Sequence, residues 1–188
     1  GFDIAKKISS SLAKKALAIK VDGEIRDLAR PITTDAAISI IMPSNDDPEA
    51  LDVLRHSCAH VLAAAVCELF PGTKLAYGPS IDDGFFYDMA TPKPITVEDF
   101  QSIEKKMKQI IKENRRFVRC DYSHEDGLKR TDGDKYKTDN AQRAIERGSE
   151  SLSFYVTGEA GTHFEDLCAG PHVPSTGKLK AFKIMAVS

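Results

Sequence analysis

Cysteine is scarce in this sequence, which has four Cys among 188 residues. They show no spacing typical of disulfides, and Cys58 and Cys67 fall on opposite sides of the helix expected around them, which favours a reducing compartment. No apolar run approaches the roughly 20 residues of a membrane span, and no signal peptide is visible. We therefore expect a cytoplasmic protein with no membrane partner.

An excess of positive charge is also lacking. The chain has 26 Lys and Arg against 28 Asp and Glu, a formal net charge of −2. A dedicated nucleic-acid-binding protein is usually strongly basic, so any contact with RNA must be local. The length suffices for a sizeable core, as one domain plus part of a second.

The few histidines and cysteines gather in two short motifs, His-Ser-Cys-Ala-His at 56–60 and Cys-Ala-Gly-Pro-His at 168–172. Each motif places two good metal or acid–base ligands four residues apart. Together they offer three imidazoles and a thiol, the ligand set of a tetrahedral zinc site. The sequence thus predicts one functional site, with these candidate metal ligands: His56, His60, Cys168 and His172.

The first motif lies in a predicted helix. Asp47 can cap this helix, Pro48 suits its first position, and Phe70-Pro71-Gly72 ends it. At about 100° per residue, the large apolar side chains form one stripe and the two histidines lie together on the opposite side. That opposite side is otherwise apolar as well. We therefore expect the helix to be covered on both sides, with its histidines facing a lined cavity.

The second motif follows a predicted strand over residues 162–168. A period of two places Phe164, Asp166 and Cys168 on one face. Gly170-Pro171 breaks the strand and turns His172 back towards it. Asp166 is therefore expected at the edge of the cavity that holds the four ligands.

Other kinds of site fit these motifs less well. A zincin protease needs Glu directly after its first histidine, where this sequence has Ser57. A structural zinc site usually has local ligands, whereas these are split between a helix and a distant strand end. Cys168 as a nucleophile would need nearby positive charge or a dedicated base, and Asp166 is close instead.

The stretch from His56 to Asp88, followed by Asp-Leu-Cys-Ala-Gly-Pro-His at 166–172, resembles the editing domain of threonyl-tRNA synthetases. Related editing domains of alanyl-tRNA synthetases carry the same H-x-x-x-H and C-x-x-x-H motifs. The Gly-Phe-Phe-Tyr-Asp run and the complete Cys-Ala-Gly-Pro-His turn favour the threonyl type. So does the segment before the helix, which resembles the second half of the TGS domain of bacterial-type threonyl enzymes.

The resemblance implies a hydrolase that removes serine from mischarged seryl-tRNA(Thr), with the 3′-seryl-adenosine of tRNA(Thr) as its partner. Serine lacks one methyl of threonine, which is worth only about 1–3 kcal/mol in a binding pocket, so a second, hydrolytic site is needed. Two alternatives stay open. They are an alanyl-type editing domain with zinc and a non-catalytic tRNA-binding module.

Residue roles follow from the resemblance and from side-chain chemistry. His56 would activate the attacking water or hold the terminal ribose hydroxyl, Asp166 would bind the seryl ammonium, and Lys137 would stabilise the oxyanion or hold water. The placement of Lys137 is less firm, because the stretch from it to Asp166 is longer than in the common bacterial pattern. The expected catalytic residues are His56, Lys137, Asp166 and Cys168, and the expected substrate-binding residues are His60, His172, Tyr87 and Asp88. For Tyr87 a role in a hairpin core is an equal alternative.

The resemblance also bears on cofactors. Threonyl-type editing domains generally work without metal and alanyl-type ones hold zinc, so we expect that editing needs no cofactor, with zinc left open. ATP, magnesium and zinc are expected only in an aminoacylation domain, which is absent here. By the same resemblance the full-length enzyme is a homodimer.

The predicted fold class is α+β, in two domains. Residues 1–45 would form a truncated β-grasp-like TGS domain without its initial strand pair. It would hold a helix with Ile4, Ile8 and Leu12 on one face, a hairpin at Asp22-Gly23, and a strand before Pro43. Residues 46–188 would form the editing domain, with the long histidine-bearing helix against an antiparallel sheet and with strands between 74 and 89.

A second helix is predicted after Thr96 and Asp99, which form a capping-box pattern. Its apolar stripe runs from Phe100 to Ile111. The far side and end of this helix carry basic residues, which either form a solvated face or contact tRNA phosphates. They are Lys105, Lys106, Lys108, Lys112, Arg115, Arg116 and Arg119.

Overall fold

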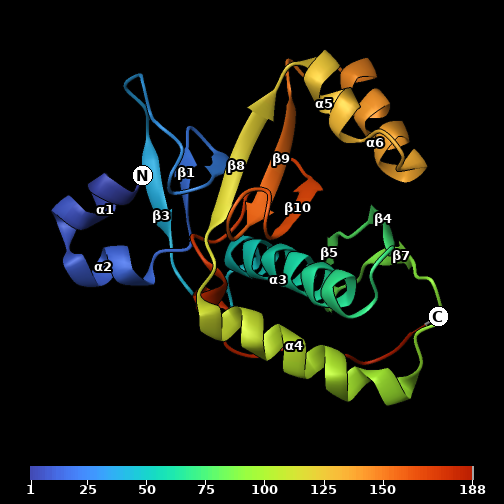
Figure 1. The fold of residues 1–188 in the computed structure, drawn as a ribbon. Helices are drawn as coiled ribbons and strands as arrows, with labels where there is room; N and C mark the ends of the chain where they lie inside the picture. Colours follow the sequence, from blue (N-terminus) through green and yellow to red (C-terminus); the bar gives the residue numbers. More distant parts are fainter. Residues whose placement is uncertain (188) are drawn as a thin grey trace.

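The computed structural model describes residues 1–187. Its N-terminal part, drawn in blue in Figure 1, is a small unit of helices and one sheet. The elements are α1 (Phe2–Ile8), α2 (Ser10–Lys15), β1 (Ala18–Val21), β2 (Glu24–Arg26) and β3 (Ile38–Ile41). The strands are antiparallel in the order β2-β1-β3. Asp22 and Gly23 have φ angles of 48° and 89°, as a tight two-residue hairpin turn requires, so the predicted hairpin is confirmed.

The first helix differs from the prediction. Ser9 is extended and caps a second helix, because its side chain accepts hydrogen bonds from the N–H groups of Ser11 and Leu12. The single helix with Ile4, Ile8 and Leu12 on one face was therefore wrong. Ile8 is 66% exposed, and the side chains that α1 and α2 bury are alanines.

The second part is an α+β unit, which confirms the predicted fold class. Its helices are α3 (Pro48–Leu69), α4 (Phe100–Glu113), α5 (His124–Arg130) and α6 (Lys135–Glu146), with 3₁₀ turns at Val97–Asp99 and Thr176–Lys178. Its strands are β4 (Lys74–Tyr77), β5 (Ser80–Ile81), β6 (Gly84–Phe85), β7 (Asp88–Ala90), β8 (Phe117–Tyr122), β9 (Leu152–Thr157) and β10 (Phe164–Leu167). The main sheet is antiparallel in the order β10-β9-β8, and β4 pairs with β7 and β5 with β6.

Helix α3 lies between the main sheet and α4 (Figure 1). Its N-cap is Asp47, whose side chain accepts from the N–H groups of Glu49 and Ala50, and it ends at Leu69 as predicted. Side chains on opposite sides of the helix are buried, among them Val61 on the apolar stripe and His60 on the histidine side. The helix is therefore covered on both sides, so its histidines are held inside the fold.

The apolar character of α3 corrects one expectation. The helix has 22 residues and a window with a mean hydropathy of 1.3, so by length and composition alone it meets the test for a membrane span. The statement that no apolar run approaches that length was thus wrong. In the fold, 61% of that window is buried, as in the core helix of a globular protein.

Candidate active site

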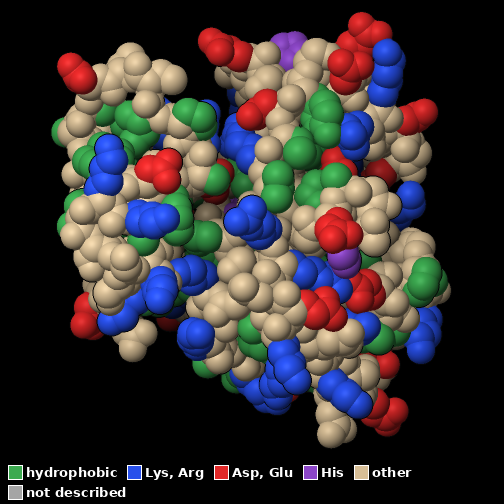
Figure 2. All heavy atoms as spheres, turned by 60° about the vertical axis from the view of Figure 1, so that its left-hand side comes forward, with side chains coloured by type: hydrophobic (Ala, Val, Ile, Leu, Met, Phe, Trp, Pro, Cys, Tyr) green, Lys and Arg blue, Asp and Glu red, His purple; other side chains and the backbone are tan. Residues whose placement is uncertain are grey.

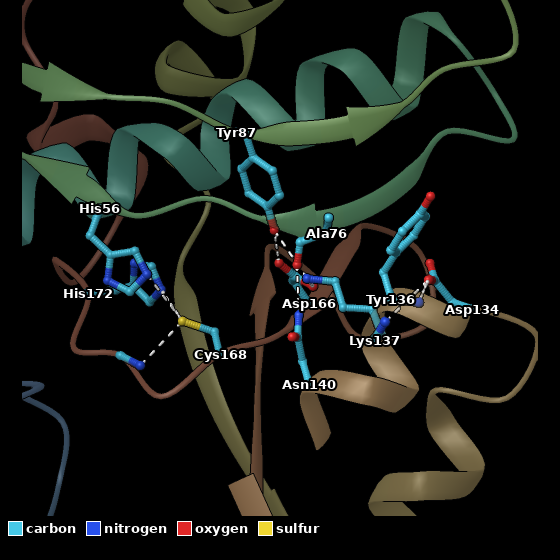
Figure 3. A network of polar contacts seen from close by, with 11 residues as sticks. His56, Ala76, Tyr87, Asp134, Tyr136, Lys137, Asn140, Asp166, Cys168 and His172 are labelled. Carbon is cyan, nitrogen blue, oxygen red and sulfur yellow. Dashed lines mark hydrogen bonds and ion pairs between the residues drawn. The ribbon is translucent and has the colours of Figure 1, made fainter. Parts of the chain in front are cut away.

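The two histidine motifs come together beside the end of β10 (Figure 3). One ligand atom from each of four residues lies within 4.8 Å of the others, and we call these four the His/Cys quartet: His56, His60, Cys168 and His172. The Cys168 Sγ lies 3.3 Å from His56 Nε2 and 3.4 Å from His172 Nε2. The predicted convergence of the two motifs is confirmed.

His172 is fixed by contacts on several sides. Its ring stacks on Phe117, with centroids 4.8 Å apart and planes at 6°. Its Nδ1 lies 3.1 Å from Ser57 Oγ, which is itself 2.7 Å from the Val53 carbonyl oxygen. The Ser57 hydroxyl has one proton, and the closer carbonyl can only accept it, so we assign a proton to His172 Nδ1. His172 Nε2 is then an acceptor that faces the Cys168 thiol.

Burial keeps the quartet uncharged. His60 and His172 are 2% and 1% exposed, and this burial lowers the pKa of each well below the ordinary value. Burial also lowers the pKa of His56, although Asp52 acts in the opposite direction. The pKa of the Cys168 thiol is raised by burial to about 12. Cys168 is therefore protonated at neutral pH, which argues against a free thiolate nucleophile.

We expect the free energy of unfolding to fall as the pH drops below about 6.5. In the unfolded chain His60 and His172 take up protons near that pH, whereas in the fold they stay neutral. The unfolded state then binds more protons, so stability rises with pH, and acid removes about 1.4 kcal/mol per pH unit for each histidine.

Urea unfolding at pH 7.5 and 5.5, with a chelator present, measures this loss of stability. Equal unfolding free energies at both pH values would contradict two neutral buried histidines.

The quartet also fits a zinc ion by its donor chemistry. Around a tetrahedral zinc ion the bonds are about 2.0 Å to nitrogen and about 2.3 Å to sulfur. The nitrogen and sulfur ligands of one ion therefore lie about 3.5 Å apart. The two contacts of the Cys168 sulfur, at 3.3 and 3.4 Å, are close to this value. Within residues 1–187 the buried His60 Nδ1 has no hydrogen-bond partner. The four quartet residues together would complete a tetrahedral shell around the ion; with a water in place of one of them, the ion would supply charge to polarise that water.

Beside the quartet, Asp166 forms a second buried group with Lys137 and Tyr87 (Figure 3). Lys137 Nζ lies 2.5 Å from Asp166 Oδ1 and 3.3 Å from the Tyr87 hydroxyl. That hydroxyl donates a hydrogen bond to Asp166 Oδ2. We call these three residues the Asp166 cluster. Because the carboxylate already has a cationic partner, a seryl ammonium would have to share it with Lys137.

The Asp166 cluster is shielded from solvent. The side chains of Asp166 and Lys137 are 3% and 11% exposed. Burial raises the pKa of Asp166, and the charge of Lys137 and the hydrogen bond from Tyr87 oppose that shift. Asp88, which follows Tyr87 in the chain, is exposed on β7, and among residues 1–187 it has no hydrogen bond or ion pair to either group.

Lys137 reaches the cluster from α6. Asp134 caps this helix by accepting from the N–H groups of Tyr136 and Lys137. One turn further, Asn140 Nδ2 donates to the carbonyl oxygen of Ala76 on β4, at 2.8 Å. Helix α6 is thereby tied to the β4-β7 pair, which leads into the segment with Tyr87.

The basic residues near α4 have different surroundings. Lys106 and Arg115 pair with Glu68, and Arg119 lies on β8, where it donates to the Ala169 carbonyl oxygen at 2.8 Å. For these three, the prediction of a free basic face was wrong. Figure 2 shows Lys and Arg side chains over the lower part of one face, at the height of α4 in Figure 1. The members that are exposed, which we call the exposed basic set, are Lys105, Lys108, Lys112 and Arg116.

Two parts of the chain match known domain families. Residues 2–42 match the family described as the TGS domain. Residues 152–188 match the family described as the threonyl and alanyl tRNA synthetase second additional domain. That second match contains Asp166, Cys168 and His172. The chain thus has the features of a region of an aminoacyl-tRNA synthetase with an editing-type domain, because it combines these two domain matches.

Longer relatives of this chain are synthetases for one amino acid, threonine. Threonine–tRNA ligase of Wolbachia sp. subsp. Drosophila simulans is 46% identical over 190 residues, which are all of this chain and 28% of the relative. The enzyme of the same name from Bartonella bacilliformis is 46% identical over 191 residues, again all of the chain and 28% of the relative. That of Anoxybacillus flavithermus is 47% identical over 188 residues, 99% of the chain and 28% of the relative.

Over its whole length the chain is therefore similar to one part of threonine–tRNA ligases, and it matches the TGS and second additional domain families within that part. It spans about 28% of the length of these relatives.

Proposed function

We propose that this chain is the editing region of a threonine–tRNA ligase and that it hydrolyses the ester of mischarged seryl-tRNA(Thr). The observation that carries the proposal is the convergence of the His/Cys quartet beside the buried Asp166 cluster. Cys168 and His172 of the quartet and Asp166 of the cluster lie within the residues that match the second additional domain. The division into residues 1–45 and 46–188 belongs to the same proposal.

The proposed reaction needs one water and no covalent enzyme intermediate. His56, which is partly exposed, takes a proton from the water as the water oxygen adds to the ester carbonyl. The bond from the carbonyl carbon to the ribose oxygen then breaks, and the proton goes to that oxygen. Serine and tRNA with a free 3′ end are the products. Lys137 would face the developing oxyanion with the N–H bond that neither Asp166 nor Tyr87 uses.

The exposure of the quartet divides its members into two pairs. His56 and Cys168 are partly exposed, whereas His60 and His172 are buried. The ester end of the tRNA would therefore meet His56 and Cys168. The other two would act as the wall behind them, and Tyr87 and Asp88 remain candidates for contacts to the terminal adenosine.

Selectivity for serine would be steric. Threonine carries one more methyl than serine, and a tightly packed pocket turns such an insertion into a cost of about 1–3 kcal/mol. This reverses the problem of the synthetic site, where the smaller serine cannot be excluded by size. Threonyl-tRNA(Thr) should therefore survive treatment with the chain.

The test is ester hydrolysis on three charged tRNAs, with the 188-residue chain in excess over each. We expect fast release from seryl-tRNA(Thr) and slow release from threonyl-tRNA(Thr) and seryl-tRNA(Ala). Preference for seryl-tRNA(Ala) would favour an alanyl-type editing domain. Binding of tRNA without hydrolysis of any ester would leave a non-catalytic module, and equal rates on the two tRNA(Thr) substrates would reject serine editing.

The same assay decides the role of metal. We expect activity to survive a chelator, because the quartet has internal hydrogen bonds and His56 can act on water as a neutral imidazole. Activity that is lost with chelator and restored by zinc would instead assign zinc to the quartet. In the full-length enzyme we propose a cytoplasmic homodimer that uses ATP, magnesium and zinc in its aminoacylation domain.

Contact with tRNA should depend on the exposed basic set. Replacing Lys105, Lys108, Lys112 and Arg116 by Ala should weaken tRNA binding and flatten its salt dependence, because each neutralised phosphate releases counterions. Fluorescence titration at several salt concentrations measures both effects. The control removes the same charge from α1 and α2, at exposed Lys6, Lys7, Lys14 and Lys15. An equal loss in the control would show that net charge alone is responsible.

A further inference from the structure

Asp27 belongs to the TGS domain and reaches the site of the second domain. It directly follows β2 and is 9% exposed. Its Oδ1 accepts a hydrogen bond from the backbone N–H of His172 at 2.7 Å. Its Oδ2 accepts from the hydroxyl of Tyr155 at 2.6 Å. One buried carboxylate therefore contacts both a member of the quartet and the aromatic ring next to it.

Tyr155 links this carboxylate to the turn of the second motif. The residue is 1% exposed, and its ring packs edge-on against His172 with centroids 4.5 Å apart. Gly170 has a φ of +73°, and a Cβ built there would collide with the Tyr155 hydroxyl oxygen. The turn and the phenol are thus packed as closely as a glycine allows, so the phenol cannot shift towards the turn without displacing it.

A second group holds the same turn from β8. Arg119 Nη1 donates to the Ala169 carbonyl oxygen at 2.8 Å and lies 3.4 Å from the Tyr155 hydroxyl. The hydroxyl therefore sits between a carboxylate from the TGS domain and a guanidinium from the second domain. Of these two groups, it is the carboxylate that accepts a hydrogen bond from the backbone of His172.

The contacts of His172 define what Asp27 can control. Its ring is held on Phe117 and by Ser57, but among the described residues its backbone N–H bonds to Asp27. The hydrogen bond to this N–H fixes the backbone of His172 and so the position of its side chain. The side chain in turn directs Nε2 towards the Cys168 sulfur, 3.4 Å away. Small displacements of reacting groups, of the order of 1 Å, can cost about 100-fold in rate.

We propose that Asp27 is a positioning residue of the editing site, supplied by the TGS domain. It sets the His172 backbone and the Tyr155 ring, and through them the geometry of the quartet. The inference rests on the proposed editing function for its kinetic readout. Its structural readout is independent of that function, because it concerns the histidine side chains themselves.

The experiment compares Asp27→Ala with Asp27→Asn, Tyr155→Phe and the control Asp35→Ala, each in the 188-residue chain. Asp35 is an exposed carboxylate of the same domain. Deacylation of seryl-tRNA(Thr) gives kcat and KM. Nuclear magnetic resonance of the five histidine side chains reports on the quartet in the same samples.

Asp27→Ala should lower kcat about 10-fold or more, with KM changed less than about threefold, and should shift the imidazole resonances of His172 and His56. Asp27→Asn keeps an oxygen for the His172 N–H and can donate its amide N–H to the Tyr155 oxygen. It should therefore return kcat to within about threefold of the unaltered chain. Tyr155→Phe should give an intermediate loss, and Asp35→Ala should change neither readout.

A purely structural role gives a different result. A lower melting temperature for Asp27→Ala, with unchanged kcat and imidazole resonances in the folded protein, would overturn the proposal. If Asp27→Ala does not fold, the test rests on Tyr155→Phe. A kcat and imidazole resonances of Tyr155→Phe equal to those of the unaltered chain would then overturn the proposal. If the unaltered chain hydrolyses no ester, the editing function fails, while the imidazole resonances still test the positioning role.

Discussion

Alanine at position 56 is expected to lower the rate of seryl-tRNA(Thr) hydrolysis at least about 100-fold, the usual contribution of a general acid or base. His56 is the imidazole that combines partial exposure with a direct contact to Cys168, at 3.3 Å. It lies on the cavity side of α3 and not on the stripe with Val61. The His56→Ala chain should therefore keep its fold. A slower hydrolysis of seryl-tRNA(Thr) would then reflect the loss of the catalytic imidazole and not unfolding.

Single-turnover hydrolysis with the chain in excess measures the rate, and circular dichroism with a melting curve checks the fold. His124→Ala is the matched control, since His124 lies on α5 and bonds to the Ser149 carbonyl outside both buried groups. It should retain full activity. A His56→Ala chain that hydrolyses seryl-tRNA(Thr) at the unaltered rate would remove His56 from the proposed mechanism.

The quartet could be predicted because each half of it depends on local periodicity. The helical period places His56 and His60 on one side of α3, and the strand period places Asp166 and Cys168 on one side of the strand predicted over residues 162–168. Both rules follow from backbone geometry alone. Motif chemistry then indicated that the two halves meet, and the structure brings their ligand atoms within 4.8 Å.

The supporting residues could not be predicted in this way. Ser57 lies inside the first motif, yet its hydrogen bond to His172 depends on how two distant segments pack. Asp27 gives no local signal, because an acidic residue after a short strand is ordinary on a protein surface. The pairing of Lys137 with Asp166 likewise needs α6 to lie against the β4-β7 pair. Spacing in the chain carries no information on these tertiary contacts.

Two of the errors have different causes, one local and one tertiary. The period in residues 4–12 favoured one helix, but the side chain of Ser9 starts a second helix, and this local hydrogen bonding outweighed the pattern. The basic residues were grouped by their place in sequence, whereas Lys106 and Arg115 are paired with Glu68 on α3. A charge can be called free only when its neighbours in space are known.

Replacing Lys137 by Met should destabilise the chain by about 3–5 kcal/mol and abolish hydrolysis. The Lys137 side chain is 11% exposed and lies 2.5 Å from a carboxylate that is 3% exposed. Removing one partner leaves the other charge buried without compensation, which is the costly way to break such a pair. Urea unfolding measures the loss of stability, and Lys129→Met is the control. Lys129 pairs with Glu125 in solvent, so its removal should cost less than about 1 kcal/mol.

The double variant Lys137→Met with Asp166→Asn separates stability from chemistry. With both charges gone no ion is left buried, and the amide oxygen introduced by Asp166→Asn would still accept the hydrogen bond from Tyr87, so most of the lost stability should return. Hydrolysis should not return, because neither the ammonium at the oxyanion nor the carboxylate for the seryl ammonium is present. Recovery of both stability and hydrolysis would mean that the Asp166 cluster only supports the fold. Failure to recover either stability or hydrolysis would show that the three side chains are needed together for packing. Hydrolysis by Tyr87→Phe, which keeps the ion pair of Lys137 and Asp166, would then test the catalytic role of the cluster.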